Sequence, residues 1–142
     1  MKLTVLIENK AARDDLAAEH GLSVYVETGV HNVLVDFGDS GAFADNAEVL
    51  GVDISKVDMA LLSHGHYDHG NGLPRFFKEN ATAPVYVNRF SFGKFFIATP
   101  KGPHYIGLPR LDEYRDRLIL TEGSSQIADG LTIISDLSGY EY

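Results

Sequence analysis

The sequence predicts an α/β chain in which one mixed sheet is flanked by helices. Short apolar runs have the length and β-branched content of strands, at residues 2–8, 22–28, 32–37, 59–63 and 83–88. Two segments between them, 40–50 and 73–79, have the apolar spacing and the end signals of helices. The early strands are joined by a hairpin and the later ones alternate with helices, so antiparallel and parallel pairs are both expected. A chain of 142 residues suits one domain, 1–142.

The amino-terminal elements are expected to be a strand, a helix and a hairpin. Residues 2–8 form the strand, and residues 9–20 are compatible with a helix that Gly21 closes as a C-cap. Only Gly29, Val30 and His31 separate the runs 22–28 and 32–37, which is a hairpin signal.

The later elements follow in a similar way. Gly51 lies just past the helix 40–50, residues 54–58 form a connector, and Pro74 lies in the first turn of the helix 73–79. Residues 89–117 contain many glycines and prolines and are expected to be irregular. Strands are predicted at 118–121 and 131–136, joined through the turn signal Ala128-Asp129-Gly130.

Composition excludes several classes of protein. The net charge is −8, from 12 basic and 20 acidic residues, which argues against a nucleic-acid-binding surface. No apolar run is long enough to span a membrane, and no signal-peptide pattern is present. The chain has no cysteine, so it has neither disulfides nor thiolate ligands. We expect a cytoplasmic protein with no nucleic-acid or membrane partner.

The most distinctive stretch is Ser63-His64-Gly65-His66-Tyr67-Asp68-His69-Gly70-Asn71-Gly72, a loop between a predicted strand and a predicted helix. Neutral imidazole and carboxylate bind zinc, iron or manganese without any thiolate. His64 and His66 can converge on one ion if the backbone bends. Asp68 and His69 leave the loop in another direction and can serve a second ion. The alternative is a polar loop whose histidines only form hydrogen bonds, and the spacing favours the metal site.

Residues 63–73 resemble the signature His-x-His-x-Asp-His of the metallo-β-lactamase superfamily. The longer form, Leu-Ser-His-Gly-His-Tyr-Asp-His-x-x-Gly-Leu, resembles the branch of dihydropterin ribofuranosylaminobenzene-phosphate synthase-like proteins. The resemblance extends to residues 3–9, 19–22, 33–38 and 46–58. It implies an αββα sandwich with the metal site between two sheets, and this chain is then its amino-terminal half. In the family, the second half supplies a further histidine for each metal and a bridging carboxylate, whereas no histidine follows His104 here.

Asp36 comes directly after the apolar run Val33-Leu34-Val35 and matches an aspartate that orients a metal-binding histidine in the family. Metal-bound imidazole normally donates its other N–H to a carboxylate, which gives this role a physical reason. Phe37 departs from the family, where a threonine usually follows. The alternative is a loop carboxylate that caps the next turn.

Other residues near the predicted site are harder to interpret. His104 is either a substrate contact, with Lys101 or Arg110, or an exposed loop histidine. Glu8 and Asn9 end a strand and either approach the site or are solvated. His20 and His31 are expected to be structural or surface residues. The aromatic residues of the irregular stretch are expected in a core or an interface: Phe90, Phe92, Phe95 and Phe96.

These observations predict a metal-dependent hydrolase that uses a metal-activated water, with zinc as the expected metal. One or two ions are expected, and iron or manganese are alternatives. Asp68 is the predicted catalytic residue, because it can also orient the nucleophile. The branch resemblance implies a phosphate-bearing, pterin-like or related small molecule as substrate. Two alternatives stay open: a non-catalytic metal-binding half-domain that self-associates through an uncovered sheet face, and a redox di-iron protein.

Overall fold

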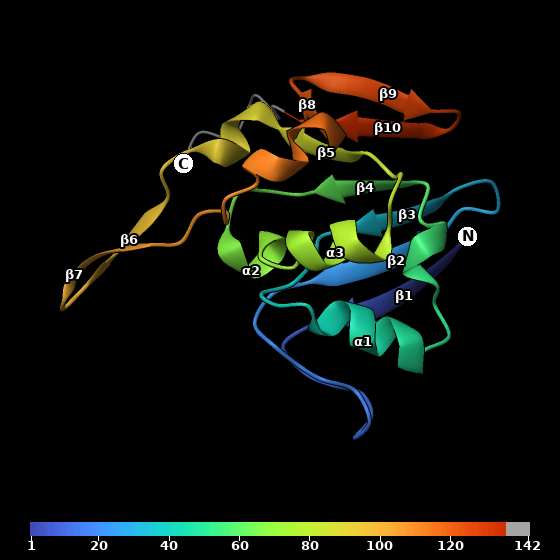
Figure 1. Ribbon diagram of the computed structural model, residues 1–142, viewed down its shortest axis with the longest axis horizontal. Coiled ribbons are helices and arrows are strands. Elements are labelled where there is room, and N and C mark those ends of the chain that lie inside the picture. The colour runs from blue at the N-terminus through green and yellow to red at the C-terminus, as the bar shows by residue number, and fades with distance from the viewer. Residues whose placement is uncertain (136–142) are drawn as a thin grey trace.

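A computed structural model describes residues 1–135, so the end of the predicted strand 131–136 lies outside the described residues. Its centre is a six-stranded sheet with the order β1-β2-β3-β4-β5-β8 (Figure 1). The strands are β1 (Lys2–Ile7), β2 (Ser23–Glu27), β3 (Asn32–Val35), β4 (Met59–Leu62), β5 (Val85–Asn88) and β8 (Leu118–Thr121). The pairs β1–β2 and β2–β3 are antiparallel, and β3–β4, β4–β5 and β5–β8 are parallel. The predicted mixed sheet is confirmed.

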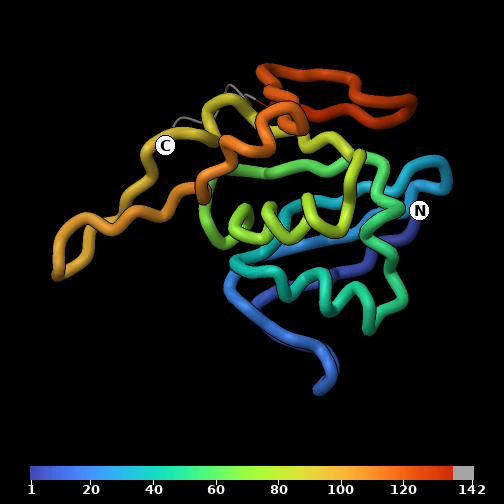
Figure 2. Tube along the Cα trace, viewed as in Figure 1, coloured from blue at the N-terminus to red at the C-terminus, as the bar shows by residue number. Residues whose placement is uncertain are grey.

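Helices cover one face of this sheet, as Figures 1 and 2 show. They are α1 (Ala42–Val49), α2 (Tyr67–Gly70) and α3 (Leu73–Glu79), with 3-10 turns η1 (Ile54–Lys56), η2 (Arg89–Phe92) and η3 (Asp112–Arg117). Both predicted helices are therefore present as α1 and α3. Gly51 follows α1 with a φ of 72°, a conformation that glycine adopts without steric cost.

A cluster of three phenylalanines fixes α1 and α3 to the sheet. The ring of Phe37 lies 6.2 Å from that of Phe43 in α1 and 5.2 Å from that of Phe76 in α3. All three side chains are fully buried. Burial of each such ring removes a large apolar area from water and stabilises the fold. The cluster therefore gives firm support to the nearby loop that follows β4.

The other face of the sheet is partly uncovered. Strand register places Leu3 and Val5 of β1 on this face, since their neighbours Thr4 and Leu6 alternate to the helical side. Leu3 is 59% exposed and Val5 is 50% exposed. Ile119, on the edge strand β8, is 41% exposed. This face carries the apolar surface from which self-association was predicted.

Two small hairpins lie outside the main sheet. The β6–β7 hairpin consists of β6 (Phe96–Thr99) and β7 (Gly102–Tyr105), and it projects away from the body in Figure 1. The second hairpin pairs β9 (Ser124–Ala128) with β10 (Leu131–Ile134). Residues 89–117 are thus less irregular than predicted. The turn signal at 128–130 joins β10 to β9, and not to the strand 118–121 as predicted.

The predicted helix over residues 9–20 is wrong, because the structure has only turns and bends there. Apart from alanines, Leu16 is the only apolar residue of the segment, so a helix would have no face to bury. The side chain of Asn46 holds the segment instead, since its Oδ1 accepts from the Ala17 N–H at 2.8 Å and its Nδ2 donates to the Ala17 carbonyl at 2.9 Å.

Within residues 1–135, none of the helices combines the length and the apolar character that crossing a membrane requires.

Candidate metal centre

The site lies where neighbouring strands of the sheet end. β4 ends at Leu62, and residues 63–66 form a loop that leads into α2. β3 lies parallel to β4 and ends at Val35, so Asp36 leaves the same edge of the sheet. The carboxyl edge of parallel strands is where loops from different elements can direct side chains at one point.

Three of the four predicted ligands converge. The ligand atoms of His64, Asp68 and His69 all lie within 4.8 Å of one another. The His69 Nε2 lies 3.6 Å from the Asp68 Oδ2, and the rings of His64 and His69 are 4.2 Å apart. Two imidazole nitrogens and one carboxylate oxygen suit zinc, and also iron or manganese. The donor set therefore fits a divalent metal ion.

His66 lies beside this group and is not one of the three. Its ring is 4.6 Å from that of His64, edge to face, and 5.3 Å from the ring of Phe95. Its backbone pairs with Gly107 in an isolated β-bridge and precedes the first residue of α2. The assignment of His64, His66, Asp68 and His69 as metal ligands stays a prediction.

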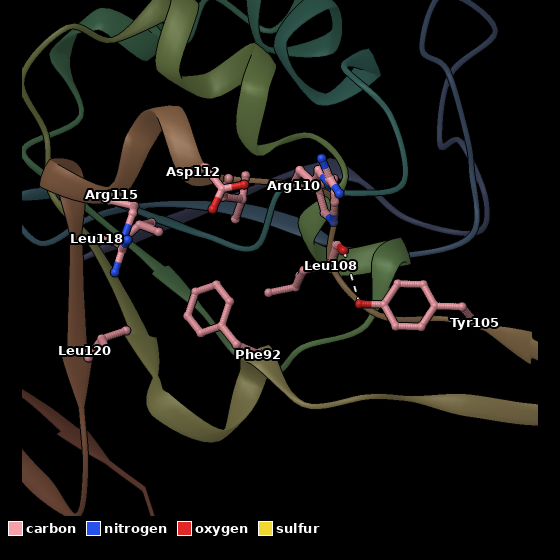
Figure 3. A pocket seen from close by; sticks show the side chains of 10 residues that line it. Phe92, Tyr105, Leu108, Arg110, Asp112, Arg115, Leu118 and Leu120 are labelled. Atoms are coloured by element: carbon pink, nitrogen blue, oxygen red, sulfur yellow. Dashed lines mark hydrogen bonds between the residues drawn. The ribbon is translucent and has the colours of Figure 1, made fainter.

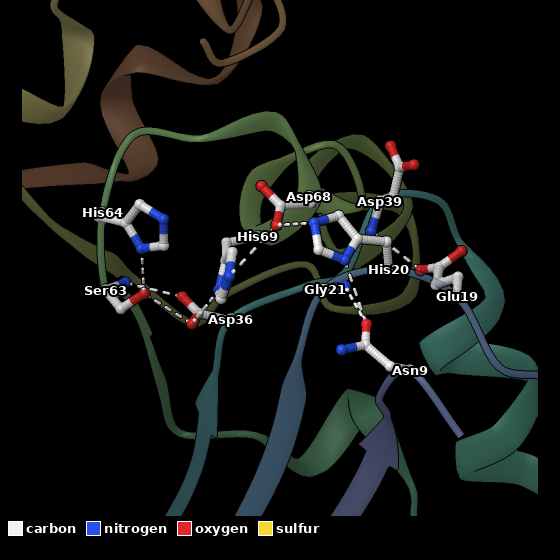
Figure 4. A network of polar contacts seen from close by, with 10 residues as sticks. All are labelled: Asn9, Glu19, His20, Gly21, Asp36, Asp39, Ser63, His64, Asp68 and His69. Atoms are coloured by element: carbon white, nitrogen blue, oxygen red, sulfur yellow. Dashed lines mark hydrogen bonds and ion pairs between the residues drawn. The ribbon is translucent and has the colours of Figure 1, made fainter. Parts of the chain in front are cut away.

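Asp36 holds His69 through a buried hydrogen bond. The carboxylate is 1% exposed, and its Oδ2 accepts from the His69 Nδ1 at 2.8 Å (Figure 4). Ser63 donates to the same carboxylate twice, from its backbone N–H at 2.7 Å and from its hydroxyl at 2.7 Å. Since a carboxylate only accepts, Nδ1 carries a proton, and neutral His69 then keeps its lone pair on Nε2. This is the contact that the predicted orienting role of Asp36 requires.

The backbone of Asp36 has a φ of 59°, the only positive φ of a non-glycine residue in the described part of the chain. Aspartate tolerates this region better than most residues, but the conformation still costs free energy. Two backbone hydrogen bonds flank it: the Asp36 N–H donates to the Leu61 carbonyl at 2.9 Å, and the Phe37 N–H donates to the His69 carbonyl at 2.8 Å. Strained residues of this kind gather at functional sites.

The histidines of the group differ in their pKa. Burial lowers the pKa of His64, and the neighbouring His69 and His66 lower it further. The hydrogen bond to Asp36 and its negative charge raise the pKa of His69, against the effect of burial. A lowered pKa keeps His64 neutral near neutral pH, which is the state that binds a metal.

His20 also reaches the site, although it was predicted to be a structural or surface residue. Its Nε2 lies 3.3 Å from the Asp68 Oδ2, and its Nδ1 lies 3.2 Å from the Asn9 Oδ1 (Figure 4). Gly21 follows with a φ of 126°, and an added Cβ there would lie 1.9 Å from the Asp68 carbonyl oxygen. Gly21 therefore serves close approach to the loop, and not the C-cap that was predicted. The resemblance at residues 19–22 was the one signal that could have pointed here.

Residues on either side of the β6–β7 hairpin contact residues 63–69, which carry the predicted metal ligands. The Tyr67 N–H donates to the Ile106 carbonyl at 2.9 Å. Gly65 approaches Ser91 so closely that an added Cβ would lie 2.0 Å from its carbonyl oxygen. His104 is exposed and does not belong to the convergent group. His31 lies in the β2–β3 turn, where its carbonyl accepts from the Thr28 N–H.

Comparisons with known proteins point to one family. A sequence model described as the Metallo-beta-lactamase superfamily matches residues 17–122. A ribonuclease of Thermus thermophilus is 37% identical over 81 residues, which cover 56% of this chain and 18% of that protein. The 7,8-dihydropterin-6-methyl-4-(beta-D-ribofuranosyl)-aminobenzene-5'-phosphate synthase of Methanocaldococcus jannaschii is 28% identical over 108 residues, which cover 71% of this chain and 37% of that protein.

Solved structures agree with this. The Rm3 metallo-beta-lactamase is similar with a TM-score of 0.56 and 25% identity, over 77% of this chain and 42% of that one. A complex of SMB-1 with mercaptoacetic acid has a TM-score of 0.54 at 19% identity, covering 78% of this chain and 44% of that one, and shows the fold alone. The predicted fold is confirmed, and the chain spans less than half the length of the four proteins compared here.

Proposed function

The chain belongs to the metallo-beta-lactamase superfamily, and on this premise we propose that it is a metal-dependent hydrolase. The observation that supports the proposal is the convergence of His64, Asp68 and His69 at the carboxyl edge of the sheet. A divalent ion held there would polarise the scissile group and supply a water whose pKa falls to about 7. Zinc is the proposed metal, with iron and manganese as alternatives.

Each residue of the group has a proposed task. His64 and His66 hold one ion, and Asp68 and His69 hold a second when two are present. Asp36 keeps the proton of His69 on Nδ1, which leaves Nε2 free to bind. Asp68 is the catalytic residue: its carboxylate accepts a hydrogen bond from the attacking water and orients it. His20, whose Nε2 lies 3.3 Å from the Asp68 Oδ2, positions that carboxylate.

The proposed substrate is a phosphate-bearing, pterin-like or related small molecule. The support is the similarity to the archaeal synthase, whose name contains both the pterin and the phosphate and which matches 71% of this chain. Nucleic acid and membrane are not proposed partners, because the net charge of −8 disfavours binding to nucleic acid and to anionic membrane surfaces.

Metal content and hydrolysis, measured on the same preparation, test the proposal. We expect weak binding, nearer one zinc than two per chain, because two ions with three protein ligands each need about six donors. Hydrolysis of bis(4-nitrophenyl) phosphate should depend on zinc and fall in Asp68→Asn. The matched control is Asp129→Asn, an exposed aspartate in the turn between β9 and β10. Hydrolysis that survives removal of all metal would contradict the proposal.

A second function is favoured by the partly uncovered sheet face. A non-catalytic, metal-binding domain that self-associates would bury Leu3, Val5 and Ile119, which are 59%, 50% and 41% exposed. Sedimentation equilibrium would then show a dimer, and Leu3→Glu with Val5→Glu should return it to a monomer. If the unchanged chain is monomeric and hydrolyses the phosphodiester, this alternative is rejected.

A further inference from the structure

A pocket separate from the metal centre lies between the base of the β6–β7 hairpin, η3 and β8. It has a volume of about 760 Å³, within the range of sites for small organic molecules. Its walls are largely apolar, and Figure 3 shows the ring of Phe92 between Leu108 and Leu120. Leu118 and Tyr105 complete these walls. Such a lining suits a flat, ring-bearing group.

Two arginines line the same pocket, Arg110 and Arg115. The chain has six arginines, and in the described residues the guanidinium groups of the other four all have a partner. Arg13, Arg75 and Arg89 form ion pairs with carboxylates, and Arg117 donates to backbone carbonyls. Within residues 1–135, Arg110 and Arg115 have neither an ion pair nor a side-chain hydrogen bond. Two unpaired guanidinium groups therefore line one pocket, and Figure 3 shows them on either side of Asp112.

The local charge is opposite to that of the whole chain. Residues 89–117, which include η3 at the pocket wall, contain six basic and three acidic residues, although the net charge of the chain is −8. Asp112 is the one carboxylate that lines the pocket, and it lies outside ion-pair distance of both arginines. The pocket thus keeps a positive excess that an anion can neutralise. Guanidinium groups bind carboxylate, sulfonate and phosphate groups in a planar, two-point geometry.

The pocket adjoins the metal centre but is separate from it. Leu108, one of its walls, packs on Gly70 in α2, where an added Cβ would lie 2.2 Å from the Leu108 Cδ2. The Tyr105 hydroxyl donates to the Leu108 carbonyl at 3.3 Å and stiffens this wall (Figure 3). None of the convergent residues His64, Asp68 and His69 lines the pocket.

We propose that this pocket is a second binding site, which takes a small planar organic anion: an aromatic ring system with one carboxylate, sulfonate or phosphate group. The ring lies against Phe92 and Leu108, one of the two guanidinium groups holds the anionic group, and the other adds to the positive charge of the pocket. The proposal does not depend on hydrolysis at the metal centre.

Titration with naphthalene-2-sulfonate, followed by ¹H–¹⁵N NMR, tests the proposal, because this probe has no bond that the metal centre is proposed to cleave. We expect saturable shifts confined to η2, residues 105–112 and β8. The double variant Arg110→Met with Arg115→Met should weaken binding at least about tenfold, since the charge-assisted contact and the second positive charge of the pocket are both lost. Naphthalene-2-methanol, a neutral probe of similar shape, should bind the unchanged protein about as weakly as the variant binds the sulfonate.

The matched control is Lys10→Met with Arg13→Met, which removes the same two charges from the exposed segment between β1 and β2. It should leave the affinity unchanged. Leu120→Trp adds bulk at a wall residue that is 60% exposed, so it should block the pocket without unfolding the chain. Equal weakening by the control pair, or unchanged binding in the Arg110/Arg115 variant, would overturn the proposal.

Discussion

Replacing Asp36 by asparagine is expected to weaken the hydrogen bonds that hold residues 63–69 and so to destabilise the fold and weaken metal binding. The Oδ2 of Asp36 accepts from the His69 Nδ1 at 2.8 Å and from the Ser63 hydroxyl at 2.7 Å, while Oδ1 accepts from the Ser63 N–H. An amide has only one oxygen, so one or two of these charge-assisted hydrogen bonds are lost. Each contributes about 1.5–3 kcal/mol, and at 1% exposure water cannot replace the acceptor. The free energy of unfolding should fall by about 1.5–6 kcal/mol.

The substitution isolates the carboxylate, because asparagine also tolerates the φ of 59° at this position. Urea unfolding measures the stability of the metal-free protein. Competition with a chromophoric chelator measures zinc affinity, which should fall about 10–100-fold when the partner of a ligating imidazole is lost. The control is Asp58→Asn: this exposed carboxylate accepts the Asn32 N–H at 2.7 Å, and its loss should cost less than about 1 kcal/mol. Equal stability and equal zinc affinity in the two variants would refute the reasoning.

Three further outcomes are expected. Asp68→Asn should keep the fold, weaken zinc binding and lower kcat more than it raises KM, because the orienting contact is realised mainly in the transition state; full metal content with full turnover would contradict this. Gly21→Ala should destabilise the chain by at least about 1 kcal/mol in urea unfolding, because its Cβ would lie 1.9 Å from the Asp68 carbonyl oxygen at a φ of 126°. Gly29→Ala in the β2–β3 turn, also at positive φ but with open space around its Cβ, controls for backbone strain alone. Burial, and then the charges of Glu27, Asp58 and Asp53, raise the pKa of Tyr25 above its ordinary value of 10.0. Folding therefore favours the protonated phenol of Tyr25. The free energy of unfolding keeps this contribution below about pH 10 and loses it as the pH rises through the folded-state pKa. Tyr25→Phe should therefore flatten the alkaline part of a plot of unfolding free energy against pH.

The elements that the sequence predicted correctly are those that bury a regular apolar pattern. β4 and β5 are short apolar runs, and α1 and α3 carry an apolar face that packs on the sheet. In the hairpin β2–β3, the signals for both strands and for the turn lie in one short stretch of sequence. In each case the local pattern and the tertiary environment favour the same structure.

The missed elements lack such a pattern. The side chains of β6 and β7 are mostly exposed, and Pro103 lies within β7, so no alternation marks them as strands. β9 begins with the three polar residues Ser124, Ser125 and Gln126, and within residues 1–135 its one strand partner is β10. Residues 9–20 have helix-forming alanines, but a helix this short needs a packed face, and the segment has none.

The candidate site also contains parts that the sequence predicted and parts that it did not. The loop 64–69 and Asp36 could be predicted because each directly follows an apolar strand at one edge of the sheet. The contact between His20 and Asp68 could not be predicted from spacing. It arises because Asn9, which accepts from the Gly21 N–H at 3.3 Å, and Glu19, which accepts from the Asp39 N–H at 2.9 Å, bring a distant segment to the loop.

The predicted ligands are close in sequence, at positions 64–69, whereas the groups that support them, such as Gly21, Asp36 and Gly107, come from distant parts of the chain. The unfolded chain therefore keeps an intact chelating peptide, although without the carboxylate that orients His69. A metal that binds both states stabilises the fold only by the ratio of its two affinities. Added zinc should thus raise the free energy of unfolding to a plateau, and not without limit. If the support around His69 strengthens binding about 10–100-fold, that plateau lies about 1.4–2.7 kcal/mol above the metal-free value.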